Sequence, residues 1–367
     1  MNVTVIGAGV AGLTCAVELA ERGVEVDVLE RSASLGVASA SPLRGVAAVE
    51  RSAASPLQGE AAAERSAACS WQAGGMLAPW CERESAEPLV ARLGQEAIGW
   101  WVDKFPGTVR NGTLVLAHGR DVAELNEFAA RTERFERVGR ERIAELEPDL
   151  AARFSQALYF PTEAHLDPRA ALAALAGRLG ARVRFGVDVT SELIREMRSA
   201  GRTVVNCTGL AAREALADLR GVKGEMVVLR IHELSLSRPV RVLHARLPIY
   251  VVPRADGLFM VGATMLESDD PRRVSVRSVL ELLSAVYALN PMFGEAEVVE
   301  IGAGVRPAFL DNLPRLRWRD GVLHVNGFFR HGFLLAPALA RMAADVLLRD
   351  ARFPEVMDED HRERRRA

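Results

Sequence analysis

Cysteine is scarce in this sequence, whose 367 residues include only Cys15, Cys69, Cys81 and Cys207, without any C-x-x-C pair. Such spacing argues against a disulfide framework and a thiolate metal site, and it suits a reducing compartment. No apolar run reaches the roughly 18 residues of a membrane-spanning helix. The first predicted strand begins at residue 2, which leaves no room for a cleavable leader. We therefore expect a cytoplasmic protein.

Two hydrolase signatures and a strong net charge are also missing. The seven histidines form no H-E-x-x-H motif, and no G-x-S-x-G motif occurs, which argues against a zinc protease and a serine hydrolase. The formal net charge is −2, so no global field favours nucleic acid or a membrane surface. The length predicts about two domains.

The segment Met1–Glu30 is predicted to form a strand, a glycine turn, a helix and a second strand. Gly7 would let the strand turn sharply, Gly9 would let the backbone approach a pyrophosphate, and Gly12 would let the helix pack closely on the strand. The pyrophosphate would lie at the helix N-terminus, where free N–H groups favour an anion. Glu30 is placed to accept hydrogen bonds from ribose hydroxyls, and it would repel the 2′-phosphate of NADP. The alternative is a glycine-rich βα turn in an ordinary parallel sheet.

An internal repeat interrupts the chain after this unit. Residues 41–54 are followed at once by residues 55–68, and the two copies differ at only three positions. A repeat with proline, glycine and few large apolar residues cannot bury enough surface to offset the entropy lost on ordering. We interpret residues 34–67 as a mobile surface insertion. The alternative is a structured flap over the adenosine end of the site.

The remaining segments predict a mixed α/β (α+β overall) architecture. Four β-rich stretches follow one another with turns and no helices between them, which is typical of an antiparallel sheet: residues 225–229, 239–243, 249–253 and 258–263. Asn111-Gly112 predicts a hairpin turn within residues 105–116. Residues 322–327 predict a strand that continues through Phe328–Gly332 into a helix over 336–348.

The chain is therefore expected to leave a Rossmann-like sheet for a second domain and to return. We assign residues 1–85, 145–220 and 300–350 to the dinucleotide-binding domain. Residues 86–144 and 221–299 are assigned to an antiparallel-sheet substrate domain, and residues 351–367 to a charged tail.

Six motifs together resemble the D-amino acid oxidase family and are most similar to the glycine oxidases of thiamine biosynthesis. They are the glycine turn with Glu30-Arg31, Ala73–Pro79, Val205–Gly209, Tyr250–Arg254, Gly304–Pro307 with Asp311–Pro314, and Asn326–Pro337. The resemblance runs nearly end to end and is interrupted by the repeat. It implies FAD as the cofactor. It also implies a homo-oligomer and a link to a thiazole synthase.

The resemblance also carries the expected cofactor contacts. Those residues are Gly7, Gly9, Gly12, Glu30, Arg31, Gly74, Gly75, Met76, Val189, Gly209, Arg330, His331, Gly332 and Leu334. Relatives with covalent flavin use a cysteine late in the chain, and none follows Cys207 here, so the FAD is expected to be non-covalent.

The resemblance places the substrate's carboxylate on Arg306, beside the Tyr250 phenol, with Arg330 as a second cation. An arginine suits this task because its planar fork grips a carboxylate bidentately. Met76 and Met265 are expected to line an apolar wall that favours a neutral amine. Large side chains at 76, 265 and 328 would leave room only for glycine or a similarly small amine. The simpler alternatives are that each of these arginines is a surface charge, that the tyrosine lies in the core and that the two methionines fill the core.

The expected reaction is oxidation of this amine by hydride transfer, for which no protein acid or base is needed. It would yield an imine, then glyoxylate and ammonia, with hydrogen peroxide formed from dioxygen. Within flavoenzymes, the alternatives are an oxidase or dehydrogenase of a D-amino acid, sarcosine or proline. A different class is a non-catalytic FAD-binding partner of a thiazole synthase.

Overall fold

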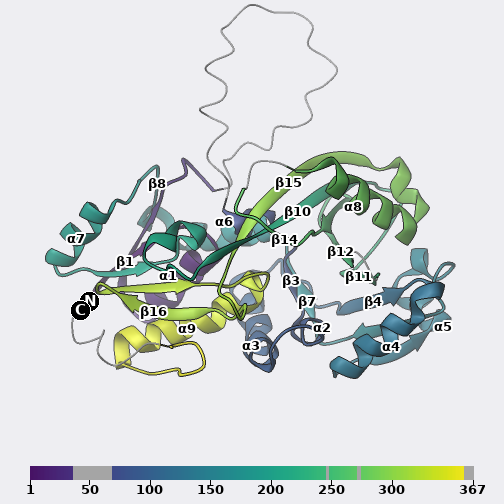
Figure 1. Cartoon of the computed structure of the whole chain (residues 1–367), viewed down its shortest axis with the longest axis horizontal. Helices are drawn as coiled ribbons and strands as arrows, with labels where there is room; N and C mark the ends of the chain where they lie inside the picture. The colour runs from purple at the N-terminus through teal and green to yellow at the C-terminus, as the bar shows by residue number, and fades with distance from the viewer. Residues whose placement is uncertain (36–67, 245–247, 271–273, 359–367) are drawn as a thin grey trace, which may run out of the picture.

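Two large β-sheets lie side by side in the computed structural model, which describes residues 1–35, 68–244, 248–270 and 274–358 (Figure 1). One sheet has six strands and the other has nine. Most of the repeat, and the prediction of a mobile insertion made for it, lies outside the described residues.

The six-stranded sheet is built on the N-terminal unit. Its order is β16 (Arg315–Arg319), β17 (Val322–Asn326), β9 (Thr203–Asn206), β1 (Asn2–Ile6), β2 (Glu25–Glu30) and β8 (Val183–Phe185). All neighbours are parallel except β16 and β17, which form an antiparallel edge. Val3 pairs with Val26 and with Thr203. The carboxyl ends of β1, β2 and β9 therefore lie together at one edge, where open α/β sheets bind ligands.

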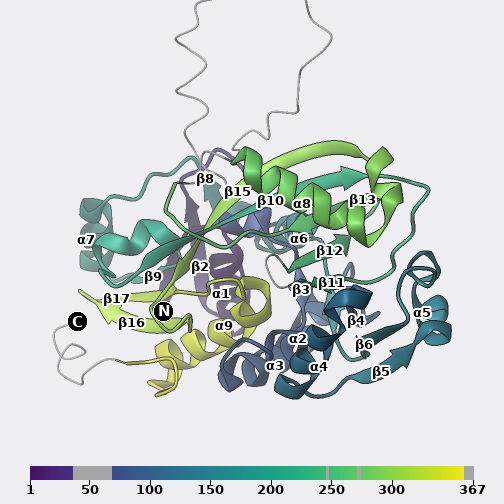
Figure 2. The same ribbon diagram turned by 45° about the vertical axis from the view of Figure 1, so that its right-hand side comes forward.

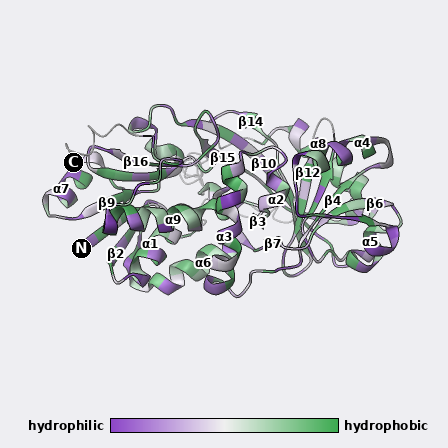
Figure 3. Ribbon diagram, turned by 90° about the horizontal axis from the view of Figure 1, so that it is seen from below, coloured by the Kyte–Doolittle hydropathy of each residue, from purple (hydrophilic) through white to green (hydrophobic). Residues whose placement is uncertain are grey.

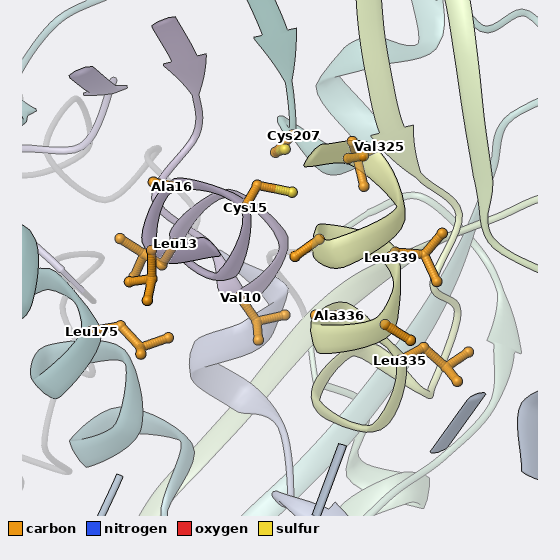
Figure 4. Close-up of a cluster of buried hydrophobic side chains, with 14 of the residues drawn as sticks. Val10, Leu13, Cys15, Ala16, Leu175, Cys207, Val325, Leu335, Ala336 and Leu339 are labelled. Carbon is orange, nitrogen blue, oxygen red and sulfur yellow. The ribbon is translucent and has the colours of Figure 1, made fainter. Parts of the chain in front are cut away.

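Helices cover this sheet with apolar faces. Helix α1 (Val10–Glu21) packs against α9 (Gly332–Arg349) and α6 (Pro168–Leu179), and α3 (Pro88–Lys104) packs against α9. Leu13 of α1 and Leu339 of α9 are both fully buried in one cluster, part of which Figure 4 shows. Asp167 caps α6 by accepting hydrogen bonds from the N–H groups of Arg169 and Ala170.

The nine-stranded sheet is mostly antiparallel and forms the second half of the molecule (Figure 2). Its order is β14 (Leu266–Glu267), β10 (Arg220–Arg230), β13 (Leu258–Gly262), β12 (Ile249–Pro253), β11 (Val240–Leu243), β4 (Thr113–Ala117), β6 (Gln156–Phe160) and β5 (Glu136–Gly139), with β15 (Glu297–Ala308) also paired to β10. Helix α8 (Val276–Leu289) packs on β10, β12 and β13, whereas α4 (Val122–Arg131) and α5 (Arg140–Leu146) pack on the β4–β6 side. Apolar segments concentrate where helices meet the sheets (Figure 3).

Short elements connect the two sheets. Strand β3 (Met76–Leu77) pairs with β7 (Ala164–His165), between the 3₁₀ helix η1 (Cys69–Gln72) and the short helix α2 (Pro79–Glu82). Helix α7 (Ser191–Ser199) precedes β9, and the remaining 3₁₀ turns are η2 (Gly119–Asp121), η3 (Pro148–Leu150), η4 (Gly180–Arg182), η5 (Gly209–Glu214) and η6 (Pro291–Glu295).

Two expected elements differ from the structure. The hairpin over residues 105–116 is wrong: only β4 forms there, and it pairs with β6 and β11, whereas Val109 makes an isolated bridge to His165. The helix expected from residue 336 begins at Gly332, so the motif residues just before it belong to a helix N-terminus.

Strand pairing and packing also distribute the chain differently from the assigned domain ranges. Strand β6 joins the nine-stranded sheet through β4, and β15 pairs with β10 along its whole length. Helix α3 buries Leu93 and Trp101 in the core of the six-stranded sheet. Helix α3, strand β6 and residues 300–308 of β15 thus pack with the other sheet than the one to which the predicted ranges assign them, whereas residues 297–299 of β15 agree with their assignment.

Gly12 allows α1 to pack closely against the turn that follows β1, so its replacement should affect stability. A Cβ at Gly12 would lie 1.8 Å from the carbonyl oxygen of Gly7, whereas a Cβ at Gly177 of α6 would meet no atom within 4 Å. We expect Gly12→Ala to lower the free energy of unfolding by about 1–3 kcal/mol, because the helix must move off the strand. Gly177→Ala should leave it unchanged or raise it by up to about 1 kcal/mol. Urea titration of both variants checks this, and equal midpoints would contradict it.

Candidate active site

A single cavity of about 1130 Å³ runs from the carboxyl edge of the six-stranded sheet to the nine-stranded sheet. Ordinary ligand pockets measure about 300–1,000 Å³, so this cavity suits an extended ligand. Every sequence-predicted site residue except Gly12 lines it: Gly7, Gly9, Glu30, Arg31, Gly74, Gly75, Met76, Val189, Gly209, Tyr250, Met265, Arg306, Arg330, His331, Gly332 and Leu334. Gly12 instead packs α1 against β1.

The glycine turn presents bare backbone to the cavity. Gly7 has a φ of +100°, and a Cβ there would lie 2.9 Å from the carbonyl oxygen of Cys207. A Cβ at Gly9 would lie 3.3 Å from the Ser70 hydroxyl and 3.9 Å from the Ala68 Cβ. The same hydroxyl accepts a hydrogen bond from the N–H of Val10 at 3.0 Å. Ser70 thus contacts the N-terminus of α1, and the sequence analysis missed it because η1 lies far away in the chain.

Glu30 is held at the end of β2 by the turn itself. Its Oε2 accepts a hydrogen bond from the N–H of Ala8 at 2.7 Å, and its Oε1 accepts one from the N–H of Ser32 at 2.8 Å. The N–H of Val187 donates to the Glu30 carbonyl, which brings the 187–189 segment alongside. Glu30 and Val189 therefore line the same end of the cavity.

Tyr250 lies between two glycines at the junction of the two sheets. A Cβ at Gly74 would be 2.7 Å from the tyrosine Cε2, and one at Gly262 would be 2.7 Å from Cζ. Gly262 faces Tyr250 in the β12–β13 pair. The small residues of the Ala73–Pro79 motif therefore leave space for an aromatic ring as well as for a ligand.

Arg306 reaches the cavity from β15, opposite Val222 of β10. Its Nη1 donates to the carbonyl oxygen of Thr264 at 3.2 Å. A Cβ at Gly224 would lie 2.1 Å from Nη2, so the guanidinium lies across the backbone of β10. Within the described part of the chain, Arg306 has no acidic partner. Met265 is 60% exposed, so it lies at the rim of the cavity rather than deep in its wall.

Arg330 and His331 lie at the start of α9, beside a carboxylate that the sequence analysis did not select. Glu82 contacts Arg330 Nη2 at 3.0 Å, and its Oε2 lies 3.6 Å from His331 Nδ1. Burial opposes ionisation of Glu82, yet Arg330, His331 and Arg241 together lower its pKa to about 2. Burial lowers the pKa of His331 to about 4, although Glu82 favours its charged form. At neutral pH, Glu82 is therefore ionised and His331 is neutral.

Arg241 of β11 is a second cavity residue that sequence reasoning missed. Its Nη1 donates to the carbonyl oxygen of Cys81 at 3.2 Å, and it lies 3.5 Å from Glu84 and 4.0 Å from Glu82. Neither Glu82 nor Arg241 belongs to a recognisable motif. The available signal was only that Glu82 follows closely after the Ala73–Pro79 segment.

Within residues 1–35, 68–244, 248–270 and 274–358, no group of three or more His, Cys, Asp or Glu side chains could hold a metal ion. Over the same ranges, no helix has the length and apolar character needed to cross a bilayer. The N-termini of α1 and α9 both border the cavity, so their dipoles favour negative charge on a ligand there.

Comparisons of sequence and structure identify known proteins that this chain resembles. The family model described as FAD dependent oxidoreductase matches residues 2–346. A Rhizobium etli protein named for thiamine biosynthesis as the oxidoreductase ThiO is 50% identical, covering 97% of this chain and 99% of that protein. A bifunctional ThiO/ThiG protein of Nostoc sp. is 27% identical, covering 95% of this chain and 52% of that protein.

Glycine oxidase from Geobacillus kaustophilus is 28% identical in sequence, covering 95% of this chain and 93% of that protein. A glycine oxidase crystal structure from the same organism aligns with a TM-score of 0.69 at 23% identity, over 95% of this chain and 94% of that one. That likeness shows a shared fold.

A buried carboxyl group near α2 generates a prediction about pH. Glu163 is fully buried, and its Oε1 accepts hydrogen bonds from the N–H groups of Trp80 and Cys81 at 3.0 and 2.7 Å. Burial raises the pKa of Glu163 to about 8 from 4.5. Between these values the folded state retains a proton that the unfolded state has lost, so this group costs more stability as the pH rises.

We expect Glu163→Gln to be more stable than the parent protein by on the order of 2 kcal/mol at pH 7, and nearly equal to it at pH 5. The matched control is Glu147→Gln, because Glu147 is as buried but accepts from Arg238 Nε at 2.8 Å. This control should be destabilised by about 3 kcal/mol at pH 7, because it leaves a buried arginine unpaired. Thermal unfolding at the two pH values decides the point, and a pH-independent effect of Glu163→Gln would contradict it.

Proposed function

Because this chain belongs to the family of FAD-dependent oxidoreductases, we propose that it oxidises glycine or a similarly small amine in the supply of the thiazole part of thiamine. The products are glyoxylate, ammonia and hydrogen peroxide. One observation carries the proposal: a single cavity joins a dinucleotide-binding turn to Arg306, which has no acidic partner among the described residues. The 50% identity to the ThiO-named protein supports the role in thiamine biosynthesis, and the similarity to a protein named glycine oxidase supports the substrate.

The residues of the cavity fit FAD at several points. Gly9 leaves room for a pyrophosphate at the N-terminus of α1, and Glu30 is fixed where ribose hydroxyls would donate to it. Arg31 and Val189 would border the adenosine, and the Gly74–Met76 and Arg330–Leu334 segments would border the ring system. Gly209 lines the cavity beyond β9. Binding is proposed to be non-covalent because no cysteine follows Cys207. When bound, FAD supplies the redox chemistry, accepting a hydride from the amine and passing electrons to dioxygen.

This chain's own residues bind and orient the substrate. The Arg306 guanidinium grips the carboxylate in a bidentate manner, and the Tyr250 hydroxyl donates beside it. Arg330 contributes to the positive potential, although Glu82 partly neutralises it. Met76 and Phe328 supply apolar surface that disfavours a charged ammonium, so the substrate amine is held in its neutral form. Met265, at the rim, limits the size of the side chain that can enter.

The relatives suggest a partner. The chain spans about half of the bifunctional ThiO/ThiG protein of Nostoc sp., so a similar unit there shares a polypeptide with ThiG. We propose that the present chain delivers its product to a separate thiazole synthase and that it assembles as a homo-oligomer. The cytoplasmic location expected from the sequence stays a prediction.

Anaerobic addition of glycine tests the proposed function. We expect the flavin absorbance near its visible maximum to bleach when glycine is added to the purified protein without air. Admitting air should restore the absorbance and release hydrogen peroxide. A yellow protein that does not bleach with glycine, sarcosine, proline or a D-amino acid would contradict catalysis and leave a binding role.

Replacing the proposed carboxylate-binding residue tests the geometry. Arg306→Leu should lower kcat/KM for glycine by about 100-fold or more, because a charge-assisted contact to the substrate is lost. Arg230→Leu is the matched control. Arg230 lies at the other end of the β10–β15 pair, where its Nη1 forms an ion pair with the Glu297 carboxylate at 2.9 Å. Retention of activity in Arg306→Leu would exclude the proposed binding mode.

A further inference from the structure

Seven arginines line the cavity, and three of them, at the junction of the two sheets, differ in how their charge is balanced. Arg241 comes from β11, Arg306 from β15 and Arg330 from the turn before α9. Among the described residues, acidic side chains contact Arg241 and Arg330 but not Arg306. Of these three guanidiniums, that of Arg306 is the one without a carboxylate of the described chain against it.

Glu82 is the carboxylate that lies against both Arg330 and Arg241. Arg330 Nη2 lies 3.0 Å from both Glu82 oxygens, and Arg241 Nη1 lies 4.0 Å from Oε1. The side chains of Glu82 and Arg241 are only 13% and 9% exposed. Arg241 belongs to the nine-stranded sheet, and Arg330 precedes α9, a helix that covers the six-stranded sheet. The two cationic partners of Glu82 therefore come from both halves of the molecule. Glu82 itself lines the cavity, so its charge acts on whatever ligand occupies that space.

The partial burial of these side chains strengthens the effect that the neutralisation of Arg330 by Glu82 has on a ligand. Opposite charges attract much more strongly in a partly buried site than in water, and a buried unpaired guanidinium attracts any available anion. A ligand with one carboxylate can use Arg306 without disturbing Glu82. A ligand with a second carboxylate near Arg330 must compete with Glu82, and it would also face the repulsion of that carboxylate.

We propose that Glu82 is a specificity-determining residue that limits the substrate site to amines with a single carboxylate, by neutralising Arg330. This inference rests on the proposed function, because it takes Arg306 as the residue that binds the substrate's carboxylate. Glu82 acts through Arg330 and is thus a positioning residue. It needs no proton transfer, and it excludes dicarboxylic amines by charge rather than by size.

Binding of two small anions tests the proposal without turnover. Acetate and malonate are titrated into the FAD-loaded protein at pH 7.5 and matched ionic strength, and the dissociation constants are read from changes in the flavin absorbance. The parent protein should bind malonate no more tightly than acetate. Glu82→Gln should tighten malonate binding by about tenfold or more, the value of one charge-assisted contact to a freed guanidinium, while acetate changes by less than about threefold.

Three variants complete the design. Glu84→Gln removes a carboxylate that also contacts Arg241 but lies in a separate small pocket, and it should leave the malonate-to-acetate ratio unchanged. Glu82→Asp retains the charge and should keep the ratio close to that of the parent. The double variant Glu82→Gln with Arg330→Gln should lose the gain in malonate binding, because the freed guanidinium is absent.

The outcomes separate this inference from the proposed function. An unchanged ratio in Glu82→Gln, or an equal gain in Glu84→Gln, would overturn the role of Glu82. If Glu82→Gln does not retain FAD, the parent protein alone still tests the proposal. Tenfold tighter binding of malonate than of acetate by the parent would show that Glu82 does not neutralise Arg330, and it would overturn the proposal. Absence of bleaching by glycine in the parent would overturn the proposed function, whatever the anion titrations show.

Discussion

The structure depends on the close approach of α1 to β1. Gly12 lies against the carbonyl oxygen of Gly7, and this contact holds the N-terminus of the helix at the carboxyl edge of the six-stranded sheet. The free N–H groups of that helix end can face a ligand only from this position. The apolar face of α1 then packs against α9, whose own N-terminus borders the same cavity (Figure 4). Two helix dipoles thereby act on one ligand.

The second sheet adds two cations to the cavity, Arg241 of β11 and Arg306 of β15. The long antiparallel pair of β10 and β15 carries Arg306 inward, and Gly224 provides the space in which its guanidinium lies. Strand β12 contributes Tyr250, whose ring fits between Gly74 and Gly262. A site at the junction of two sheets can thus bind a large cofactor on one side and select a small ligand on the other.

Charge balance distinguishes the two kinds of arginine at this junction. Arg330 and Arg241 share Glu82, which stays ionised because the surrounding cations outweigh the cost of its burial. This cluster joins α2, β11 and the start of α9, so it fixes the relative positions of segments from both sheets. The same contacts that stabilise the junction also set the charge that a substrate meets there.

The sequence by itself determined the local units whose signals lie within a few residues. The Gly7–Gly12 turn and Glu30 at the end of β2 each follow from nearest neighbours and periodicity. Only the tertiary structure decided which distant elements meet. It turned the expected hairpin around Asn111 into a single strand paired with β6, brought Ser70 to the start of α1, and placed Glu82 between Arg241 and Arg330. These contacts join residues far apart in the chain, and no local pattern encodes them because their energies arise from packing and charge pairing in the folded state.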